Sequence, residues 1–263
     1  MNSLRLDLNC DLGESFGTWA MGDDENVLPH VSSANIACGF HAGDPQTMQR
    51  SVALCVQHNV AIGAQPGWPD LLGFGRRSLA ATAAETYALV LYQIGALAGF
   101  APTAQARLAH VKPHGALYNQ AAQDPALAQA IARAVADFDA TLILYALAGS
   151  ELEKAGHAAS LAVAREAFAD RRYLDDGSLQ PRSQPGAVIE DPARACQQAL
   201  AIVQHQQVTT CSGQTLPLQA DTLCIHGDRA NAANFAATLR SALVEHGVDI
   251  DAPRKSCGHT PPE

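Results

Sequence analysis

Ionisable and amide side chains recur directly after short apolar runs along this 263-residue chain. Asn9 and Asp11 follow the first run, His41 follows the second, and Lys112 and His114 follow the fourth. Carboxylates and imidazoles can act as general bases or acids, and an ammonium group can stabilise developing negative charge. This combination indicates an enzyme active site that carries out acid–base chemistry.

The same pattern continues in the second half of the chain. The strand-end residues there are Glu166, Asp170, Arg171, His226 and Asp228. A single Asp or His after a strand can also be a turn cap or a satisfied core group. Lys112 is harder to explain in this way, because a lysine that ends the run Ala-His-Val-Lys would be buried, and a buried ammonium needs a carboxylate or an anionic ligand beside it.

These residues can meet only if the strands that carry them run in parallel. Short apolar runs alternate with longer stretches of helical spacing, which is typical of β/α units. The predicted strands are Leu4–Asn9, Ala34–Cys38, Val60–Gln65, Ala109–Lys112, Thr141–Ala146, Leu161–Glu166 and Thr222–His226. The strands of a parallel barrel all end at one face, so the polar residues are expected to converge in one pocket.

Helical spacing predicts six helices between these strands. They are Pro45–His58, Ala83–Gly99, Pro125–Asp137, Ser150–Gly156, Pro192–Gln206 and Asn231–Gly247. Asp44 and Asp191 each precede a proline, as N-cap residues do. A hairpin is predicted within Val208–Leu218.

The expected fold is therefore a TIM-like (β/α) barrel, seven-stranded and incomplete. It forms a single domain over residues 1–252, followed by a flexible C-terminal tail over residues 253–263. An open α/β sheet is the alternative, although no G-x-G-x-x-G follows the first strand.

Composition excludes several classes of function. The net charge of −9, with scattered Lys and Arg, argues against nucleic acid as a partner. Asp7 and Asp11 interrupt any signal-peptide core, and no stretch is expected to approach the roughly 20 apolar residues of a membrane span, which predicts a cytoplasmic protein with no membrane partner. The seven cysteines are irregularly spaced without C-x-x-C, so no disulfide framework is expected.

Six motifs stand out, and they carry a resemblance that covers the chain from roughly residue 7 to residue 247. They are Asp7-Leu8-Asn9-Cys10-Asp11-Leu12-Gly13-Glu14, the run 35–44, Gly73-Phe74-Gly75-Arg76-Arg77, the run 111–119, the run 166–171 and His226-Gly227-Asp228. In these motifs the chain resembles the LamB/YcsF lactam-utilization family, which includes the A subunit of bacterial 5-oxoprolinase.

The resemblance implies an incomplete TIM-like barrel related to the polysaccharide-deacetylase superfamily. It also implies ATP-dependent cleavage of 5-oxoproline to glutamate, together with two partner subunits. The implied catalytic residues are Asp11, His41, Lys112 and His114. The implied substrate-binding residues are Asn9, Glu166, Asp170, Arg171, His226 and Asp228. ATP would be a co-substrate with magnesium, although the chain has no G-x-x-x-x-G-K-[ST] phosphate loop.

Specific roles can be assigned on this basis. Asp11 is expected to act as the base or to orient it, His41 or His114 to carry the proton, and Lys112 to stabilise the oxyanion. Arg171 is expected to pair with Glu166 or Asp170, as a scaffold or a carboxylate clamp.

One position departs from the family pattern. Many relatives have histidine where this chain has Gln65, and a neutral amide is a poor transition-metal ligand. No tightly bound transition metal is therefore expected. Two other functions remain open: a metal-dependent amidohydrolase or deacetylase acting alone through Asp11, His41 and His114, and a non-catalytic subunit that only binds the substrate.

Overall fold

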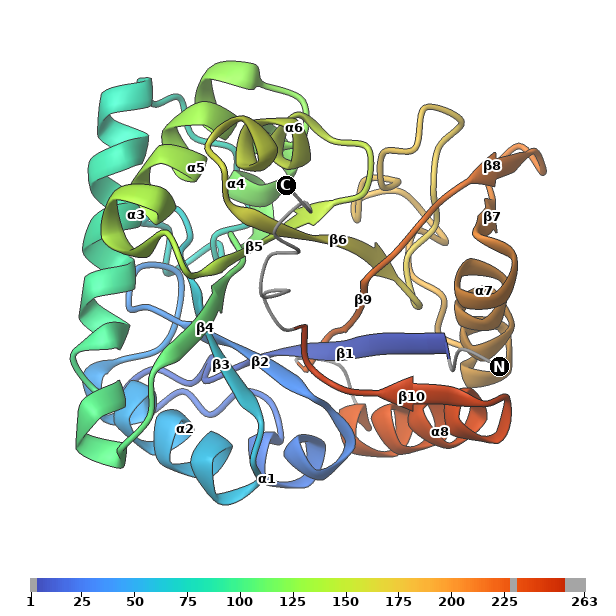
Figure 1. The fold of residues 1–263 in the computed structure, drawn as a ribbon, viewed down its shortest axis with the longest axis horizontal. Coiled ribbons are helices and arrows are strands. Elements are labelled where there is room, and N and C mark those ends of the chain that lie inside the picture. The colour runs from blue at the N-terminus through green and yellow to red at the C-terminus, as the bar shows by residue number, and fades with distance from the viewer. Residues whose placement is uncertain (1–3, 228–230, 254–263) are drawn as a thin grey trace, which may run out of the picture.

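Seven parallel strands close into a barrel in the computed structural model, which describes residues 4–227 and 231–253 (Figure 1). The ring consists of β1 (Leu4–Leu12), β2 (Ser33–Ala37), β3 (Ala61–Gln65), β4 (Leu108–Val111), β5 (Ile143–Leu147), β6 (Ala162–Phe168) and β9 (Thr222–Ile225). It closes because β1 pairs with β2 on one side and with β9 on the other. The expected seven-stranded TIM-like barrel is thus confirmed, and the open-sheet alternative is wrong.

The first strand is longer than predicted because it serves two partners on one side. Leu4, Arg5 and Leu6 pair with β10 (Val248–Ile250), and the residues from Asp7 onward pair with β9. A three-residue strand such as β10 leaves little periodic signal, which explains why the sequence did not reveal it. The barrel is incomplete only in strand number, since the ring of seven is closed.

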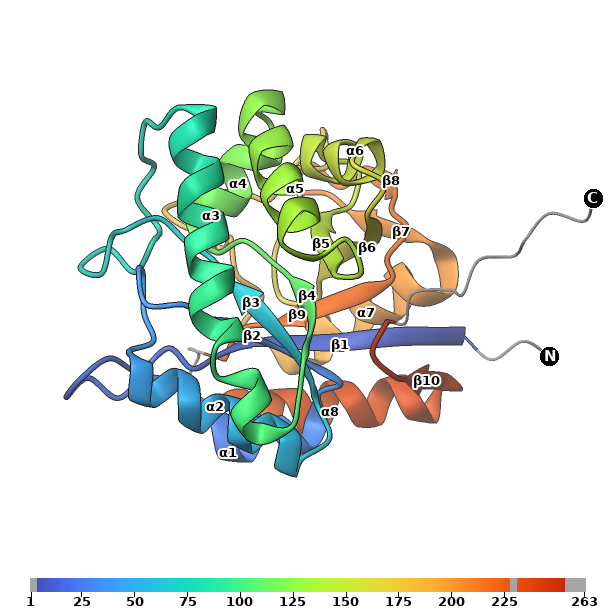
Figure 2. The same cartoon turned by 60° about the vertical axis from the view of Figure 1, so that its left-hand side comes forward.

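Helices cover the outside of the barrel (Figures 1 and 2). They are α1 (Asp24–Val27), α2 (Pro45–Gln57), α3 (Ala83–Ala98), α4 (Gly115–Ala121), α5 (Pro125–Asp139), α6 (Glu151–Ala158), α7 (Pro192–His205) and α8 (Ala232–Glu245), with short 3-10 turns at Leu28–His30 and Ala101–Ala104. The Asp44 and Asp191 side chains accept hydrogen bonds from Thr47 N and Ala193 N, which confirms both N-caps. The predicted hairpin is also present, as β7 (Gln207–Thr209) and β8 (Thr215–Pro217).

One helical segment, Ala83–Ala104, is long and apolar enough to cross a membrane by length and composition alone. The expectation that no segment reaches this limit is therefore wrong. In the structure, however, α3 packs against α5, and its Gln93 side chain bonds to both backbone groups of Gly67. An apolar outer helix of a barrel meets the same criterion as a membrane span.

Polar side chains fill the interior of the barrel, where a TIM barrel usually holds branched apolar residues. Because side chains alternate along a strand, Asp7, Asn9 and Asp11 of β1 point inward, while Leu6 and Leu8 join the apolar core between barrel and helices. All three inward residues are buried. Burying so many polar groups is tolerable only if they bond to one another across the barrel.

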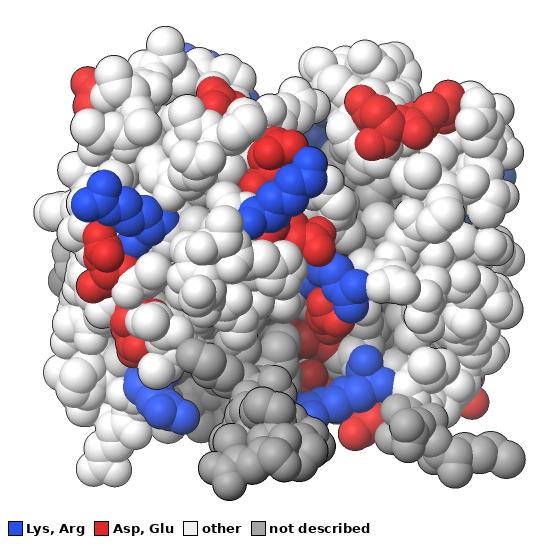
Figure 3. Space-filling model, turned by 45° about the horizontal axis from the view of Figure 1, so that its top comes forward, with Lys and Arg blue, Asp and Glu red and all other residues white. Residues whose placement is uncertain are grey.

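The surface bears charges of both signs. On the face shown in Figure 3, basic side chains lie beside acidic ones and form no broad basic patch. Ion pairs such as Arg165–Asp221 (2.8 Å) and Lys154–Glu151 (2.7 Å) are of this mixed kind. This face offers no continuous contact for a phosphate backbone.

Candidate active site at the barrel mouth

Lys112, immediately after β4, lies at the centre of the polar cluster. Its Nζ atom is 3.0 Å from Asp11 Oδ1, 2.8 Å from Glu166 Oε1 and 3.2 Å from Asn9 Oδ1. Nζ also donates to Cys224 Sγ at 3.0 Å. The strands β1, β6 and β9 thus supply the partners of one buried ammonium group, which confirms that these strand ends converge.

The electrostatics favour charged forms of Lys112 and Asp11. Burial disfavours the ammonium, but the neighbouring carboxyl groups of Asp11 and Glu166 favour it, and the pKa of Lys112 is raised well above its ordinary value. Burial likewise opposes ionisation of Asp11, yet the positive charge of Lys112 holds the pKa of that carboxyl below its usual range. A buried pair of this kind gives a permanent positive charge beside a permanent carboxylate.

Two stacked imidazole rings lie beside this cluster. The rings of His41 and His114 have centroids 3.8 Å apart and planes 6° apart. Burial lowers the pKa of His114 to about 4 and that of His41 well below its ordinary value, so both rings are neutral at pH 7. Gln65 lies against His41, without a hydrogen bond of good geometry among the described residues.

The tautomer of His114 follows from its neighbour. Its Nε2 atom is 2.9 Å from the carbonyl oxygen of Phe74, which can only accept a hydrogen bond. Nε2 therefore carries the hydrogen, and Nδ1 keeps the lone pair. Nδ1 has no hydrogen bond among the described residues and lies 4.0 Å from Glu14 Oε1.

The loop of residues 70–77 covers the two rings. The ring of Phe74 meets His114 edge-on, with centroids 5.0 Å apart, and Arg76 lies 4.8 Å over the ring of Phe74. Arg77 pairs with Asp70 at the base of the loop. These two arginines hold the loop, and their interactions explain the Gly-Phe-Gly-Arg-Arg motif structurally.

The remaining predicted residues form a second group at the mouth. Nδ1 of His226 is 3.0 Å from Asp170, and Arg171 donates to the carbonyl oxygen of Gln180 at 2.6 Å. Burial lowers the pKa of Arg171 to about 10, and the neighbouring charge of Arg182 adds to this. Glu166, one of the two partners expected for Arg171, is instead bonded to Lys112.

Two predictions fall beyond the part of the chain that the structure describes. Asp228 lies outside the described residues. The same applies to residues 254–263, which make up nearly all of the predicted tail.

Sequence reasoning missed Cys224, which contacts Lys112 directly, and two side chains that approach the cluster from below. Asn35 of β2 bonds to Asn9 and Asp11, and His110 of β4 bonds to Asn35. Each lies within a predicted strand rather than at its end. Their signal is the two-residue spacing: His110 stands two residues before Lys112 and therefore points into the barrel as Lys112 does.

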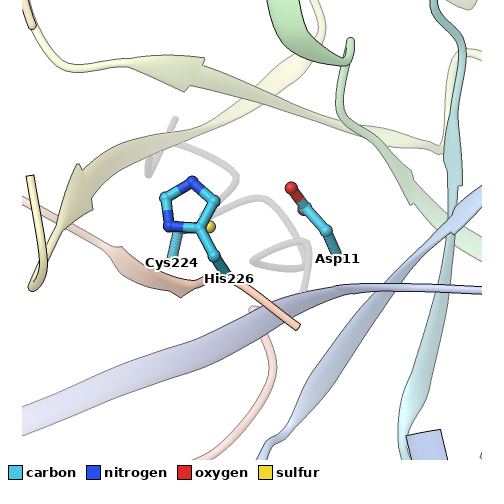
Figure 4. A group of neighbouring side chains, drawn as sticks. All are labelled: Asp11, Cys224 and His226. Atoms are coloured by element: carbon cyan, nitrogen blue, oxygen red, sulfur yellow. The ribbon is translucent and has the colours of Figure 1, made fainter. Parts of the chain in front are cut away.

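Among the described residues, two groups of three have the composition of a metal site, and the chemistry of one and the geometry of the other argue against a transition metal. Asp11, Cys224 and His226 point into one space (Figure 4). The ammonium of Lys112 bonds to both Asp11 and Cys224 there, and burial raises the pKa of the Cys224 thiol well above its ordinary value. A divalent ion would meet a fixed cation and a protonated thiol, and thiol ligands bind metals as thiolates.

The second group is Glu14, His41 and His114. Each imidazole nitrogen binds a metal through a lone pair in its ring plane, and zinc lies about 2.0–2.1 Å from that nitrogen. Because the two rings are stacked and nearly parallel, their lone pairs do not converge on one point. Within the described part of the chain, neither of these two groups therefore fits a transition metal.

A cavity of about 910 Å³ lies between the loop that follows β6 and the start of α7. Arg172, Arg182 and Arg194 line it, together with Glu190 and Asp191. None of the predicted site residues lines this cavity. This cavity and the polar cluster are thus separate features.

Acidification from about pH 6.5 to pH 4 should destabilise the protein. Burial lowers the pKa of His110 to about 3 and that of His114 to about 4. A histidine whose folded pKa lies below its unfolded value of about 6.5 binds fewer protons in the folded state than in the unfolded state. The free energy of unfolding therefore decreases as the pH is lowered. Each such residue contributes up to about 1.4 kcal/mol per pH unit within this window.

Urea unfolding at several pH values measures this slope. His110→Gln removes one titrating ring and should make the slope shallower by about one such contribution. An identical slope in the variant would show that His110 is not buried in its neutral form.

Comparison with known proteins places the chain in a family. The sequence model of the LamB/YcsF family matches residues 6–257. The A subunit of 5-oxoprolinase from Tolumonas auensis is 57% identical over 248 residues, which is 94% of this chain and 99% of that protein. The A subunit of 5-oxoprolinase from Methylococcus capsulatus is 59% identical over 247 residues, which is 94% of this chain and 95% of that protein.

Solved structures agree. A lactam utilization protein from Thermus thermophilus has a TM-score of 0.89 and 48% identity, covering 95% of this chain and 100% of that one. A family 4 carbohydrate esterase from Streptomyces lividans has a TM-score of 0.50 at 10% identity, and the match covers 95% of this chain and 92% of that one. At this identity, the likeness concerns the fold alone. Because the family match extends over nearly the whole length, this chain belongs to the LamB/YcsF family.

Proposed function

We propose that this chain is the A subunit of a 5-oxoprolinase, which opens 5-oxo-L-proline to L-glutamate with hydrolysis of ATP and together with two partner subunits. The observation that carries the proposal is the buried Lys112 ammonium between Asp11 and Glu166, beside two neutral histidines. The names of relatives 54–59% identical to the chain support the substrate and the existence of partners.

The chemistry explains why such a cluster is needed. A five-membered lactam is a resonance-stabilised amide, and its hydrolysis adds OH to the carbonyl carbon and H to the ring nitrogen as the C–N bond breaks. ATP would supply the driving force by phosphorylating the amide oxygen, with release of ADP. Addition of water and cleavage of the C–N bond then leave an acyl phosphate, and a second water molecule hydrolyses it to the glutamate carboxylate and inorganic phosphate. The protein must then activate water, stabilise charge at that oxygen and protonate the departing nitrogen.

The geometry supports a role for each group at the mouth. Lys112, which is charged at neutral pH, stabilises negative charge on the oxygen. Asp11, held ionised, receives or directs the proton of the attacking water. Of the two histidines, His114 is the better proton carrier because its tautomer leaves Nδ1 free to accept. Arg171, whose neighbour Asp170 bonds to His226, is assigned the substrate carboxylate because a guanidinium group can bind a carboxylate through two hydrogen bonds.

Reconstitution tests the proposal. Glutamate release from 5-oxoproline should require this chain, the two partner subunits and magnesium with ATP at the same time. Partner subunits that gave the full rate without this chain would exclude a catalytic role and favour a substrate-binding subunit. Release by this chain alone, without ATP, would favour an independent amidohydrolase.

We also propose that no transition metal is tightly bound, since the Lys112 ammonium and a protonated Cys224 thiol occupy one group of possible ligands, and the stacked rings of His41 and His114 do not converge in the other. After treatment of this chain with a chelator, the complex should still release glutamate at the normal rate once magnesium is restored for the nucleotide. Elemental analysis of untreated protein should find well below one zinc, iron or manganese per chain. Stoichiometric metal whose removal abolishes activity and whose return restores it would support the metal-dependent alternative.

We further propose that the protein is cytoplasmic and has neither a membrane nor a nucleic acid as a partner. The six described cysteines are all free, as is usual for proteins in a reducing compartment.

A further inference from the structure

Asn35 lies directly below the Asp11–Lys112 pair and is wholly buried. Its strand β2 pairs with β1 so that Asn35 is opposite Asp11. The Nδ2 atom donates to Asn9 Oδ1 at 2.7 Å and to Asp11 Oδ1 at 2.9 Å. An amide NH₂ has two hydrogens, so both are used within the cluster.

The orientation of this amide is fixed by its neighbours. Asn35 Oδ1 lies 2.8 Å from Nε2 of His110. If the amide were flipped, its oxygen would face Asn9 Oδ1 and Asp11 Oδ1, both of which only accept hydrogen bonds. The Asn9 amide is fixed in turn, because its Nδ2 donates to Glu166 and Thr222 while its oxygen faces the ammonium of Lys112.

His110 is held as a neutral donor. Burial lowers its pKa to about 3, and its ring stacks on Tyr145 with centroids 4.1 Å apart. The absence of a side chain at Gly63 makes room for the ring: a Cβ atom at position 63 would stand on the His110 ring. A neutral ring whose Nε2 faces an amide oxygen must carry its hydrogen on Nε2.

From this chain of contacts we infer that Asn35, oriented by His110, is a positioning residue that holds the Asp11 carboxylate and, through Asn9, the Lys112 ammonium in their working geometry. The inference rests on the proposed function for its activity readout. Neither residue needs to touch the substrate. Each acts by directing an N–H group toward an oxygen whose position the chemistry depends on.

Asn35→Asp is the most direct test, because it keeps the shape and replaces the donor with an acceptor. The new carboxylate would face Asp11, and like charges at this distance raise the pKa of one of the two. We expect turnover to fall about 10- to 100-fold with little change in KM. We also expect the acid limb of the kcat profile to move to higher pH. The other titratable groups facing Asp11 are Lys112, His114, Cys224 and His226, and the variant leaves them in place.

A matched control separates positioning from simple loss of stability. Ser33→Ala alters a fully buried polar residue of the same strand that bonds to Asp7 and Tyr145, away from Lys112. It should lower the melting temperature while leaving the pH profile unchanged. His110→Gln keeps an N–H donor near Asn35 and should retain most of the turnover, whereas His110→Leu should lose it as Asn35→Asp does.

A readout independent of activity keeps this test apart from the proposed function. The melting temperature of Asn35→Asp should fall further below that of the unaltered protein as pH rises from about 4 to 7. A carboxyl whose pKa is raised on folding binds more protons in the folded state, so its stabilisation is lost with rising pH.

If the unaltered complex releases no glutamate but this pH-dependent deficit appears, the proposed function fails and the positioning contact stands. If the deficit is independent of pH, or if Asn35→Asp has turnover within twofold of normal with an unshifted profile, the inference is wrong.

Discussion

Replacing Lys112 by methionine should lower glutamate release by two or more orders of magnitude. Removal of one group that stabilises a developing oxyanion typically costs about 10²–10³ in rate. Lys112 is the group that we propose for this role, with Nζ held by oxygens from β1 and β6 within 3.2 Å. The loss should fall on kcat rather than on KM, because the charge matters most in the transition state.

The single variant also has a structural cost that must be separated from the chemical one. It leaves Asp11 and Glu166 buried without their cation, and breaking a buried pair in this way costs about 3–5 kcal/mol of stability. The double variant Lys112→Met/Glu166→Gln removes one negative charge with the positive one, which should restore much of the stability. Turnover should stay low in the double variant. If turnover in either folded variant is near normal, Lys112 is a structural ion-pair residue.

The second large effect is expected for Asp11→Asn. The asparagine oxygen can still accept from Lys112 and Asn35, so the fold should change little. A group that accepts or directs a proton in the transition state is worth about 10²–10⁴ in rate. We therefore expect turnover to fall by at least about 10²-fold, as measured with the complete complex and ATP.

Asp7→Asn is the matched control for this change. Asp7 lies four residues earlier on β1 and is also buried, and it accepts from Tyr145 and Thr222 in the lower part of the barrel. The loss of such bonds should destabilise the protein by about 1–3 kcal/mol. Turnover should remain within a few-fold of normal. Equal loss of turnover in both variants would mean that Asp11 contributes stability rather than chemistry.

Much of the fold was determined by local pattern. The alternation of apolar runs and helical stretches predicted all seven strands of the ring, and the capping aspartates before Pro45 and Pro192 fixed where two helices begin. Both signals are carried by residues a few positions apart, so they survive in the sequence alone. The polar residues at strand ends likewise predicted one shared mouth, because parallel strands have a common direction.

Which of those residues touch was decided only by the closed barrel. Glu166, a candidate partner of Arg171, bonds to Lys112, and His41 stacks on a histidine 73 positions away. Asn35 and His110 are not at strand ends at all, yet they orient the central carboxylate. Periodicity tells which side of a strand faces inward. Contacts across the interior depend instead on the relative stagger of strands from distant parts of the chain, which is set only when β1 pairs with β9 and the ring closes.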